Sequence, residues 1–301
     1  MGSYKIRESL PILLLSFSLA FLSLVGPGIH PAIAQGSPQE PSLDVPWEPS
    51  EDAVVAEMLK IAEVNKGDIL YDLGCGDGRI VIQAAKEIGV RGIGIDLDPK
   101  RIQESMENAR RAKVTDRVQF KQQNLFDAHI SEATVVMLYL WPEVNLRLRP
   151  KLFRELKPGT RIVLHSHNMG KWKPDRSIVA PNGHSVYFWV MPANASGTWE
   201  WGLKGGKTYT LKLEQKFQEV TGTINAGASQ APVKELTLKG DLLQFTLDDK
   251  INGRPSALHF EGRIGGNTLQ GSVEALESGK RDWQARRDPS SITSPEKKDE
   301  E

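Results

Sequence analysis

Residues 71–80, YDLGCGDGRI, combine three glycines and two aspartates directly after an apolar run. Glycines let the backbone turn sharply and approach a ligand without a Cβ in the way. The glycines of this stretch are Gly74, Gly76 and Gly78. Asp72 and Asp77 make the same turn acidic, so the stretch predicts close binding of a ligand with a positively charged end.

The spacing of the glycines distinguishes between two kinds of nucleoside ligand. A dinucleotide-binding loop would need its third glycine at position 79, where this chain has Arg79. Such a loop receives a pyrophosphate on free backbone amides, and Asp72 and Asp77 would repel a pyrophosphate. S-adenosylmethionine carries an ammonium and a sulfonium and has no phosphate. The loop therefore predicts S-adenosylmethionine as the ligand.

The segments around the loop alternate between short apolar runs and amphipathic stretches. Strands are expected over residues 68–74, 92–96, 117–123, 134–140, 160–166 and 185–192. Helices are expected over 79–89, 99–113 and 143–156, after a first helix that Ser50 is expected to cap with its hydroxyl. This alternation predicts an α/β fold with an open, mostly parallel sheet and helices on both faces. Ligands of such sheets bind beyond the carboxyl ends of the strands.

Two further strand ends supply polar residues to the same edge of the sheet. Asp96 follows the second strand, 22 residues after Gly74, where a carboxylate can accept both ribose hydroxyls. Asn124 follows the third strand and can pair with adenine. The predicted cofactor-binding residues are Asp72, Gly74, Cys75, Gly76, Asp77, Asp96, Leu97, Asn124 and Leu125.

The motifs DLGCGDGR and GIGIDLDP resemble those of the class I S-adenosylmethionine-dependent methyltransferases, and the resemblance covers roughly residues 46–192. It implies S-adenosylmethionine as the methyl donor and a Rossmann-like sheet of seven strands. It also implies cofactor roles for Asp72, Gly74, Gly76, Asp96 and Asn124. The stretch VPWEPSEDAVVAEML, together with DLGCGDGRIVIQAA, further resembles protein-lysine methyltransferases that include the enzymes acting on the ATP synthase c-subunit. That likeness implies a protein lysine as the methyl acceptor, with a small molecule as the alternative.

The residues after the fourth expected strand are candidates for contact with the acceptor. The predicted catalytic residues are Tyr139, Trp141 and Glu143. The two aromatic faces could hold a methylated ammonium by cation–π contact, and Glu143 could take a proton from the amine. Alternatively, both rings pack in the core. The Asn-Pro-Pro-aromatic signature of amino-group methylation on adenine or glutamine is missing here, which lowers the rank of those substrates.

Histidines and bulk charge add little to this interpretation. His165 and His167 alternate at the end of the fifth strand and either face the site or satisfy backbone groups there. Their spacing predicts no metal site. The chain has 38 basic and 38 acidic residues, so bulk charge suggests neither nucleic acid nor an anionic membrane surface as a partner.

The N-terminus predicts export. Lys5 and Arg7 precede an apolar run over residues 10–25, and residues 32–34, Ala-Ile-Ala, offer a cleavage site. If the signal is not cleaved, it would anchor the chain in the membrane instead. Either outcome places the remaining residues across the membrane, in a periplasmic, lumenal or extracellular location.

The C-terminal third changes to alternating polar and apolar residues, which predicts an antiparallel all-β domain. Trp199, Trp201 and Trp283 are expected in its core rather than on a sugar-stacking surface. The expected order is a signal over residues 1–34, a proline-rich lead-in over 35–50, a methyltransferase domain over 51–195, the β domain over 196–287 and a disordered tail over 288–301.

Three classes of function remain open at this point, because the donor is made in the cytosol whereas the signal exports the chain. The first is an exported methyltransferase. The second is an exported protein that binds S-adenosylmethionine without turnover and whose β domain is the binding module. The third is an envelope-binding module with a vestigial cofactor site. The presence of Asp72, the three glycines and Asp96 in one chain favours the first two.

Overall fold

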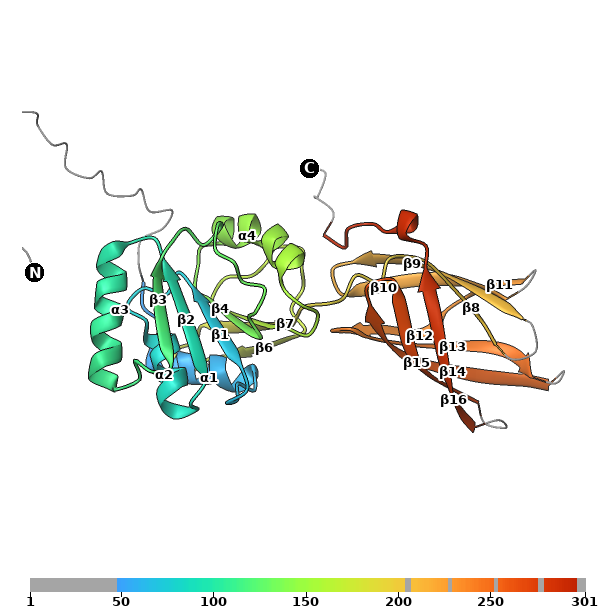
Figure 1. Cartoon of the computed structure of the whole chain (residues 1–301), viewed down its shortest axis with the longest axis horizontal. Helices are drawn as coiled ribbons and strands as arrows, with labels where there is room; N and C mark the ends of the chain where they lie inside the picture. Colours follow the sequence, from blue (N-terminus) through green and yellow to red (C-terminus); the bar gives the residue numbers. More distant parts are fainter. Residues whose placement is uncertain (1–47, 204–206, 227–228, 252–253, 276–278, 297–301) are drawn as a thin grey trace, which may run out of the picture. The chain divides into compact units, whose positions relative to one another are not determined.

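The computed structural model describes residues 48–203, 207–226, 229–251, 254–275 and 279–296 (Figure 1). The expected export signal and most of the proline-rich lead-in lie outside the described residues. Within these ranges, no helix combines the length and apolar character that a membrane crossing requires.

The first sheet has seven strands in the order β3-β2-β1-β4-β5-β7-β6. Its strands are β1 (Ile69–Leu73), β2 (Arg91–Asp96), β3 (Val118–Gln122), β4 (Val135–Leu138), β5 (Arg161–His165), β6 (Arg176–Val179) and β7 (Ser185–Val190). The first five strands pair in parallel, and β7 runs antiparallel to both β5 and β6. Strand β6 was not predicted, because its four residues are mostly exposed and show no apolar run.

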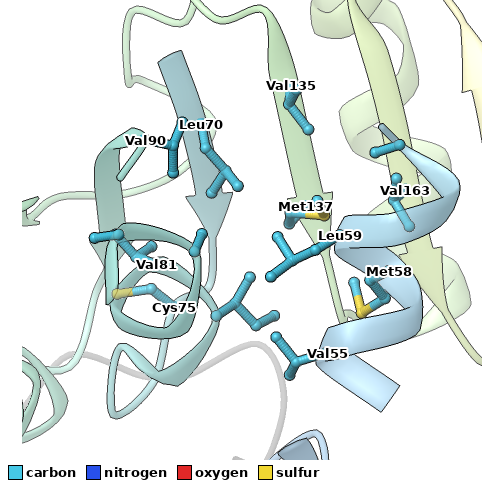
Figure 2. Packing of buried hydrophobic residues seen from close by; sticks show 14 of the residues in the cluster. Val55, Met58, Leu59, Leu70, Cys75, Val81, Val90, Val135, Met137 and Val163 are labelled. Carbon is cyan, nitrogen blue, oxygen red and sulfur yellow. The ribbon is translucent and has the colours of Figure 1, made fainter. Parts of the chain in front are cut away.

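Two apolar layers cover the two faces of this sheet. The helices are α1 (Asp52–Ile61), α2 (Arg79–Glu87), α3 (Pro99–Ala112) and α4 (Pro142–Glu155). Helices α1, α2 and α3 contribute to one layer, and α4 contributes to the other. Figure 2 shows the first layer, in which Leu59 of α1 lies near Met137 of the sheet and Met58 lies on the side of Val163. The predicted open, mostly parallel Rossmann-like sheet is confirmed.

The beginning of α1 differs from the prediction. Glu51 occupies the N-cap position and makes no capping hydrogen bond with its side chain. The expected cap, Ser50, is buried, and its Oγ lies 2.8 Å from Nδ1 of His165. The capping prediction was wrong because capping patterns consider only neighbouring residues, whereas the partner of this hydroxyl lies 115 residues further along the chain.

The second sheet is antiparallel and has nine strands in the order β11-β10-β9-β8-β16-β15-β14-β13-β12. Its strands are β8 (Gly197–Gly202), β9 (Thr208–Lys216), β10 (Glu219–Ala226), β11 (Ser229–Pro232), β12 (Lys234–Lys239), β13 (Leu242–Ile251), β14 (Arg254–Gly265), β15 (Thr268–Ala275) and β16 (Gly279–Arg287). Strands β10 and β12 also come into contact, and the Val233 amide donates to the carbonyl of Gly222 at 3.4 Å. The sheet therefore curls until its two ends nearly meet. The predicted antiparallel all-β fold is confirmed.

Aromatic side chains fill the interior of the second sheet. Trp199, Trp201 and Trp283 are at most 6% exposed, which confirms their assignment to the core. The Trp201 ring lies 5.5 Å from the Phe260 ring and 5.1 Å from the Trp283 ring in edge-on arrangements.

The segment after the last strand is ordered, contrary to the expected disorder from Asp288 onward. Residues Pro289–Ser291 form a short 3-10 helix, η1. The carbonyl of Pro295 accepts the amide of Phe217 at 2.9 Å, and Glu296 pairs with Arg149 at 3.1 Å. Disorder was predicted from the polar composition of the segment. Composition does not reveal that the Glu296 carboxylate has a buried partner, Arg149. Residues 297–301 lie outside the described residues.

Candidate active site

The turn between β1 and α2 is held in a left-handed conformation by its glycines. The φ angles are 84° at Gly74, 53° at Gly76 and 78° at Gly78. A Cβ at Gly74 would also lie 2.7 Å from Cδ2 of Leu140. The amides of Gly74 and Cys75 donate to the carbonyl of Ile95, at 2.8 and 3.0 Å, and so fix the turn to the end of β2.

A cavity opens beyond the carboxyl ends of the parallel strands, as expected for an open sheet of this type. Eight of the nine predicted cofactor residues line it: Asp72, Gly74, Cys75, Asp77, Asp96, Leu97, Asn124 and Leu125. The ninth, Gly76, donates its amide to Oδ2 of Asp96 at 2.8 Å. Lining residues that the sequence analysis did not assign to the site include Glu48, Ser50, Arg79, Arg101 and Leu140.

Asp72 has the chemistry of a site for a cation. It is 2% exposed, and its Oδ2 has no hydrogen-bond partner among the described residues. Burial, together with the nearby charges of Asp96 and Asp77, raises the pKa of Asp72 to about 8. A buried, unpaired carboxyl oxygen is costly unless a ligand supplies its partner. The cavity therefore fits a ligand with an ammonium or sulfonium group, as S-adenosylmethionine has.

Backbone amides hold the side chains of Asp96 and Asn124 in place, and each side chain keeps further hydrogen-bonding groups that a ligand could use. The Oδ1 of Asp96 accepts the Asp98 amide at 3.0 Å, and each oxygen keeps a further lone pair that could accept a ribose hydroxyl. The Oδ1 of Asn124 accepts the Phe126 amide at 3.0 Å, so its Nδ2 group is the donor that could meet a base. Both residues line the cavity, and their roles toward the ribose and the adenine stay predictions.

Asp77 contributes less negative charge to the cavity than its residue type suggests. Its carboxylate pairs with Arg79, at 2.6 Å from Nη2 and 2.9 Å from Nε. Nη1 of Arg79 also donates to the carbonyl of Ser50 at 2.9 Å. Arg79 therefore ties the glycine turn to the segment before α1. This role was not predicted, because Arg79 was considered only as the residue that replaces the third glycine of a dinucleotide-binding loop.

Cys75 lines the cavity as a small apolar residue. It is 6% exposed and belongs to the first apolar layer. Burial raises the pKa of its thiol well above the ordinary value, so the reactive thiolate is disfavoured. Cys75 was predicted among the cofactor-binding residues, and that role stays a prediction.

The three predicted catalytic residues are not all brought to the cavity. Tyr139 lines it, and its Oη donates to Oε2 of Glu48 at 3.1 Å. Trp141 is 44% exposed and lies 6.2 Å, ring to ring, from His167, which excludes core packing for this ring. Glu143 is exposed in the first turn of α4. The described lining residues include neither Trp141 nor Glu143.

Comparison with known proteins places this site in a family. The ANTKMT methyltransferase domain family matches residues 72–176. A protein-lysine N-methyltransferase of Saccharolobus islandicus is 45% identical over 151 residues, which are 49% of this chain and 94% of that protein. The chain belongs to the class I S-adenosylmethionine-dependent methyltransferases, within the family that contains this protein-lysine N-methyltransferase.

Two further comparisons describe proteins similar to the methyltransferase. The lysine N-methyltransferase of the ATP synthase c-subunit from Mus musculus is 27% identical over 195 residues, which cover 65% of this chain and 75% of that protein. A solved structure described as an RNA methyltransferase from Salinibacter ruber, in complex with S-adenosyl-L-homocysteine, is 52% identical, with a TM-score of 0.47. It covers 48% of this chain and 93% of that chain.

The methyltransferase uses S-adenosylmethionine, whose positive sulfur activates the methyl carbon toward a nucleophile. The described part of the chain contains no group of histidine, cysteine and carboxylate side chains that could hold a metal. The residues of the site mainly bind and orient, because methyl transfer requires that nucleophile, carbon and sulfur lie in one line. With the donor bound, Asp72 would offer its carboxylate to the cationic end, and Asp96 would offer its carboxylate to the ribose.

The Arg79 contacts predict a measurable contribution to stability. Replacing Arg79 with methionine leaves Asp77, which is 8% exposed, without its partner. We expect the free energy of unfolding to fall by about 1–3 kcal/mol, less than for a fully buried pair because the arginine is partly exposed. Urea titration measures the change.

A matched control for this variant is Arg91→Met, which breaks an exposed pair with Glu132 at 3.7 Å. Exposed pairs contribute little, so we expect a change below about 1 kcal/mol. Equal urea midpoints for the two variants would contradict the role given to Arg79.

Proposed function

We propose that this methyltransferase transfers methyl groups to lysine side chains of a protein substrate. The observation that carries the proposal is the likeness to the archaeal protein-lysine N-methyltransferase, which extends over nearly the whole of that protein. The family domain, which begins at Asp72 in β1 and ends at Arg176, the first residue of β6, supports the same conclusion.

The cavity supports an alkyl amine, which binds as its ammonium and reacts after losing a proton, as the acceptor group. Tyr139 presents a half-buried ring at the cavity, with Glu48 bound to its hydroxyl. Burial and the hydrogen bond to Glu48 both raise the pKa of Tyr139, so the hydroxyl stays neutral at physiological pH. An aromatic face beside a carboxylate offers cation–π and ionic contact to a lysine side chain.

The proposal is tested by transfer of labelled methyl groups to the proteins of a cell extract. Extracts of cells that lack this protein are incubated with the purified enzyme and methyl-labelled S-adenosylmethionine, and the digested proteins are analysed by mass spectrometry. We expect label on the side-chain nitrogen of lysine in one or a few proteins. Label confined to RNA or to small molecules would contradict the proposal.

Variants of Tyr139 test the acceptor contact in the same assay. Tyr139→Ala is expected to lower kcat/KM for the lysine acceptor about 5- to 30-fold, because a cation–π contact of about 1–2 kcal/mol is lost. The matched control, Tyr139→Phe, keeps the ring and removes only the hydroxyl bound to Glu48. It is expected to retain most of the activity. Equal losses in the two variants would exclude the aromatic contact.

The compartment of the acceptor is a second part of the proposal. The N-terminal pattern of Lys5, Arg7 and the following apolar run supports export of the enzyme. The labelling assay should therefore be run separately on envelope and cytoplasmic fractions. We expect the labelled lysine in the envelope fraction, and an acceptor found only in the cytoplasm would contradict export.

A further inference from the structure

The turn between β9 and β10 belongs to the second sheet but packs into the methyltransferase domain. It consists of Phe217 and Gln218, since Lys216 and Glu219 pair across it. Phe217 is 3% exposed and belongs to the apolar layer of the first sheet that also contains α4. Its ring stacks on the ring of Trp172 with a centroid separation of 6.0 Å. The turn therefore contributes to the core of the methyltransferase domain.

The backbone of this turn suits the contact better than it suits the residue. Phe217 has a φ angle of 56°, in the left-handed region, where a bulky side chain is rare. Two-residue hairpin turns with positive φ usually contain asparagine or glycine. A phenylalanine persists in this conformation where its surroundings hold it. Here the buried ring packs on Trp172, and the amide of Phe217 donates to the carbonyl of Pro295 at 2.9 Å.

Gln218 holds the β5–β6 loop, residues 166–175, through two hydrogen bonds. Its Oε1 accepts the indole N–H of Trp172 at 2.8 Å, and its Nε2 donates to the carbonyl of Lys173 at 2.8 Å. Trp172 is fully buried, and a buried N–H without a partner is costly. The second sheet therefore supplies the partner of a buried polar group in the methyltransferase domain.

The segment after the second sheet holds the same loop through α4. Arg149 donates from Nη1 to the carbonyl of Met169 at 3.0 Å and pairs with Glu296 at 3.1 Å. The side chains of this ion pair are at most 10% exposed. Met169 forms an isolated β-bridge with Trp172. Residues 169–173 are thus held from two directions.

The beginning of the β5–β6 loop borders the acceptor side of the cavity. The ring of His167 lies 6.3 Å from the ring of Tyr139 and 6.2 Å from the ring of Trp141. Tyr139 lines the cavity, and Trp141 is 44% exposed. One residue separates His167 from Met169 in the chain. The place of the His167 ring therefore depends on how residues 169–173 are held.

We propose that Gln218 is a positioning residue for binding of the acceptor, an inference that rests on the protein-lysine activity proposed above. Gln218 holds the β5–β6 loop and thereby keeps His167 beside Tyr139 and Trp141. The part of the acceptor protein next to the lysine binds against these rings, since aromatic residues are enriched in protein interfaces. The second sheet takes part in acceptor binding in this way without touching the reacting atoms.

Hydrogen exchange followed by mass spectrometry tests the hold on the loop without turnover. Gln218→Met keeps the approximate length of the side chain and removes both hydrogen bonds. With S-adenosylhomocysteine bound, we expect the amides of residues 166–173 to exchange at least about fivefold faster than in the unaltered protein. The amides of β1 and β2 should keep their rates. Equal rates for residues 166–173 in the two proteins would overturn the proposal.

Turnover with poly-L-lysine as the acceptor tests the consequence for binding. Gln218→Met is expected to raise KM for poly-L-lysine about 5- to 20-fold and to leave kcat within about threefold, because the loop binds the acceptor and does not touch the reacting atoms. The dissociation constant of S-adenosylhomocysteine should stay within about twofold. An unchanged KM, or a loss of donor affinity as large as the change in KM, would overturn the positioning role.

A second variant tests whether the effect passes through His167. His167→Ala should raise KM for poly-L-lysine to a similar degree, and the double variant with Gln218→Met should raise it no further, because both changes displace one ring. Multiplied effects in the double variant would overturn this route.

The matched control is Gln270→Met, which changes an exposed glutamine of β15 in the same sheet. It should behave as the unaltered protein in both measurements. If the unaltered protein methylates neither poly-L-lysine nor any protein of an extract, the proposed function fails and the acceptor role of Gln218 fails with it. Normal methylation by both the unaltered protein and Gln218→Met would overturn the positioning role alone.

Discussion

Replacing Asp72 with asparagine is expected to abolish the pH dependence of donor binding. In the folded chain without ligand, Asp72 holds a proton up to about pH 8, which the unfolded chain loses near pH 4. Binding of a cationic donor favours the carboxylate and releases that proton. The affinity for S-adenosylhomocysteine should therefore rise up to about tenfold per pH unit between pH 5.5 and 7.5.

Asparagine at position 72 has the same shape and no charge, so its affinity should be low and nearly constant across this range. At pH 7.5 we expect it to bind about 10- to 100-fold more weakly than the unaltered protein, since a hydrogen bond to a charged group contributes about 1.5–3 kcal/mol. At pH 5.5 the two should converge. Isothermal titration calorimetry measures both curves.

The exposed Asp116 supplies the control, because Asp116→Asn also removes one carboxylate. It should keep the pH dependence of the unaltered protein.

The stability of the folded protein without ligand should change with pH in the opposite direction to the binding affinity. Its free energy of unfolding includes a contribution from Asp72 that is present at low pH and is lost as pH rises through about 8. An affinity that falls from pH 5.5 to 7.5 would contradict the role of Asp72.

Asp96→Ala is expected to weaken donor binding about 100-fold or more. The carboxylate holds the amides of Gly76 and Asp98 and is placed to accept the ribose hydroxyls. Loss of two charge-assisted hydrogen bonds corresponds to about 3–4 kcal/mol. The dissociation constant of S-adenosylhomocysteine, measured by calorimetry, gives the loss directly.

An analogue of S-adenosylhomocysteine without ribose hydroxyls separates the two roles of Asp96. The unaltered protein should bind this analogue much more weakly than S-adenosylhomocysteine, whereas Asp96→Ala should bind the two ligands within about threefold of each other. If Asp96→Ala still discriminates as strongly as the unaltered protein, the hydroxyls are bound elsewhere. The residue would then act only by holding the glycine turn.

The structure brings to the cavity most of the site residues that local sequence patterns predicted. Gly74, Asp96 and Asn124 each lie at or directly after the end of a predicted strand, and parallel strands bring their carboxyl ends to one edge of the sheet. Strand and helix types could be assigned for the same reason, because hydrophobic periodicity depends on neighbouring residues. The pattern around Asp72 also indicated a cationic ligand.

Contacts between distant residues could not be predicted in this way. The Ser50–His165 bond spans 115 residues, and the Arg149–Glu296 pair spans 147. Neither partner carries a local signal of the other, so Ser50 was interpreted as a helix cap and Glu296 as part of a disordered tail. Strand β6 was missed because pairing with β7, rather than apolar side chains, holds it in the sheet.

The near-closure of the nine-stranded sheet bears on how the protein behaves at high concentration. An open sheet exposes unpaired amides and carbonyls along its outermost strands, where a second molecule can add by strand pairing and begin to aggregate. Here the outermost strands are β11 and β12, and the Val233–Gly222 bond joins the region between them to β10. The free edge available for intermolecular pairing is thereby shortened, which favours solubility of a domain so rich in β-structure.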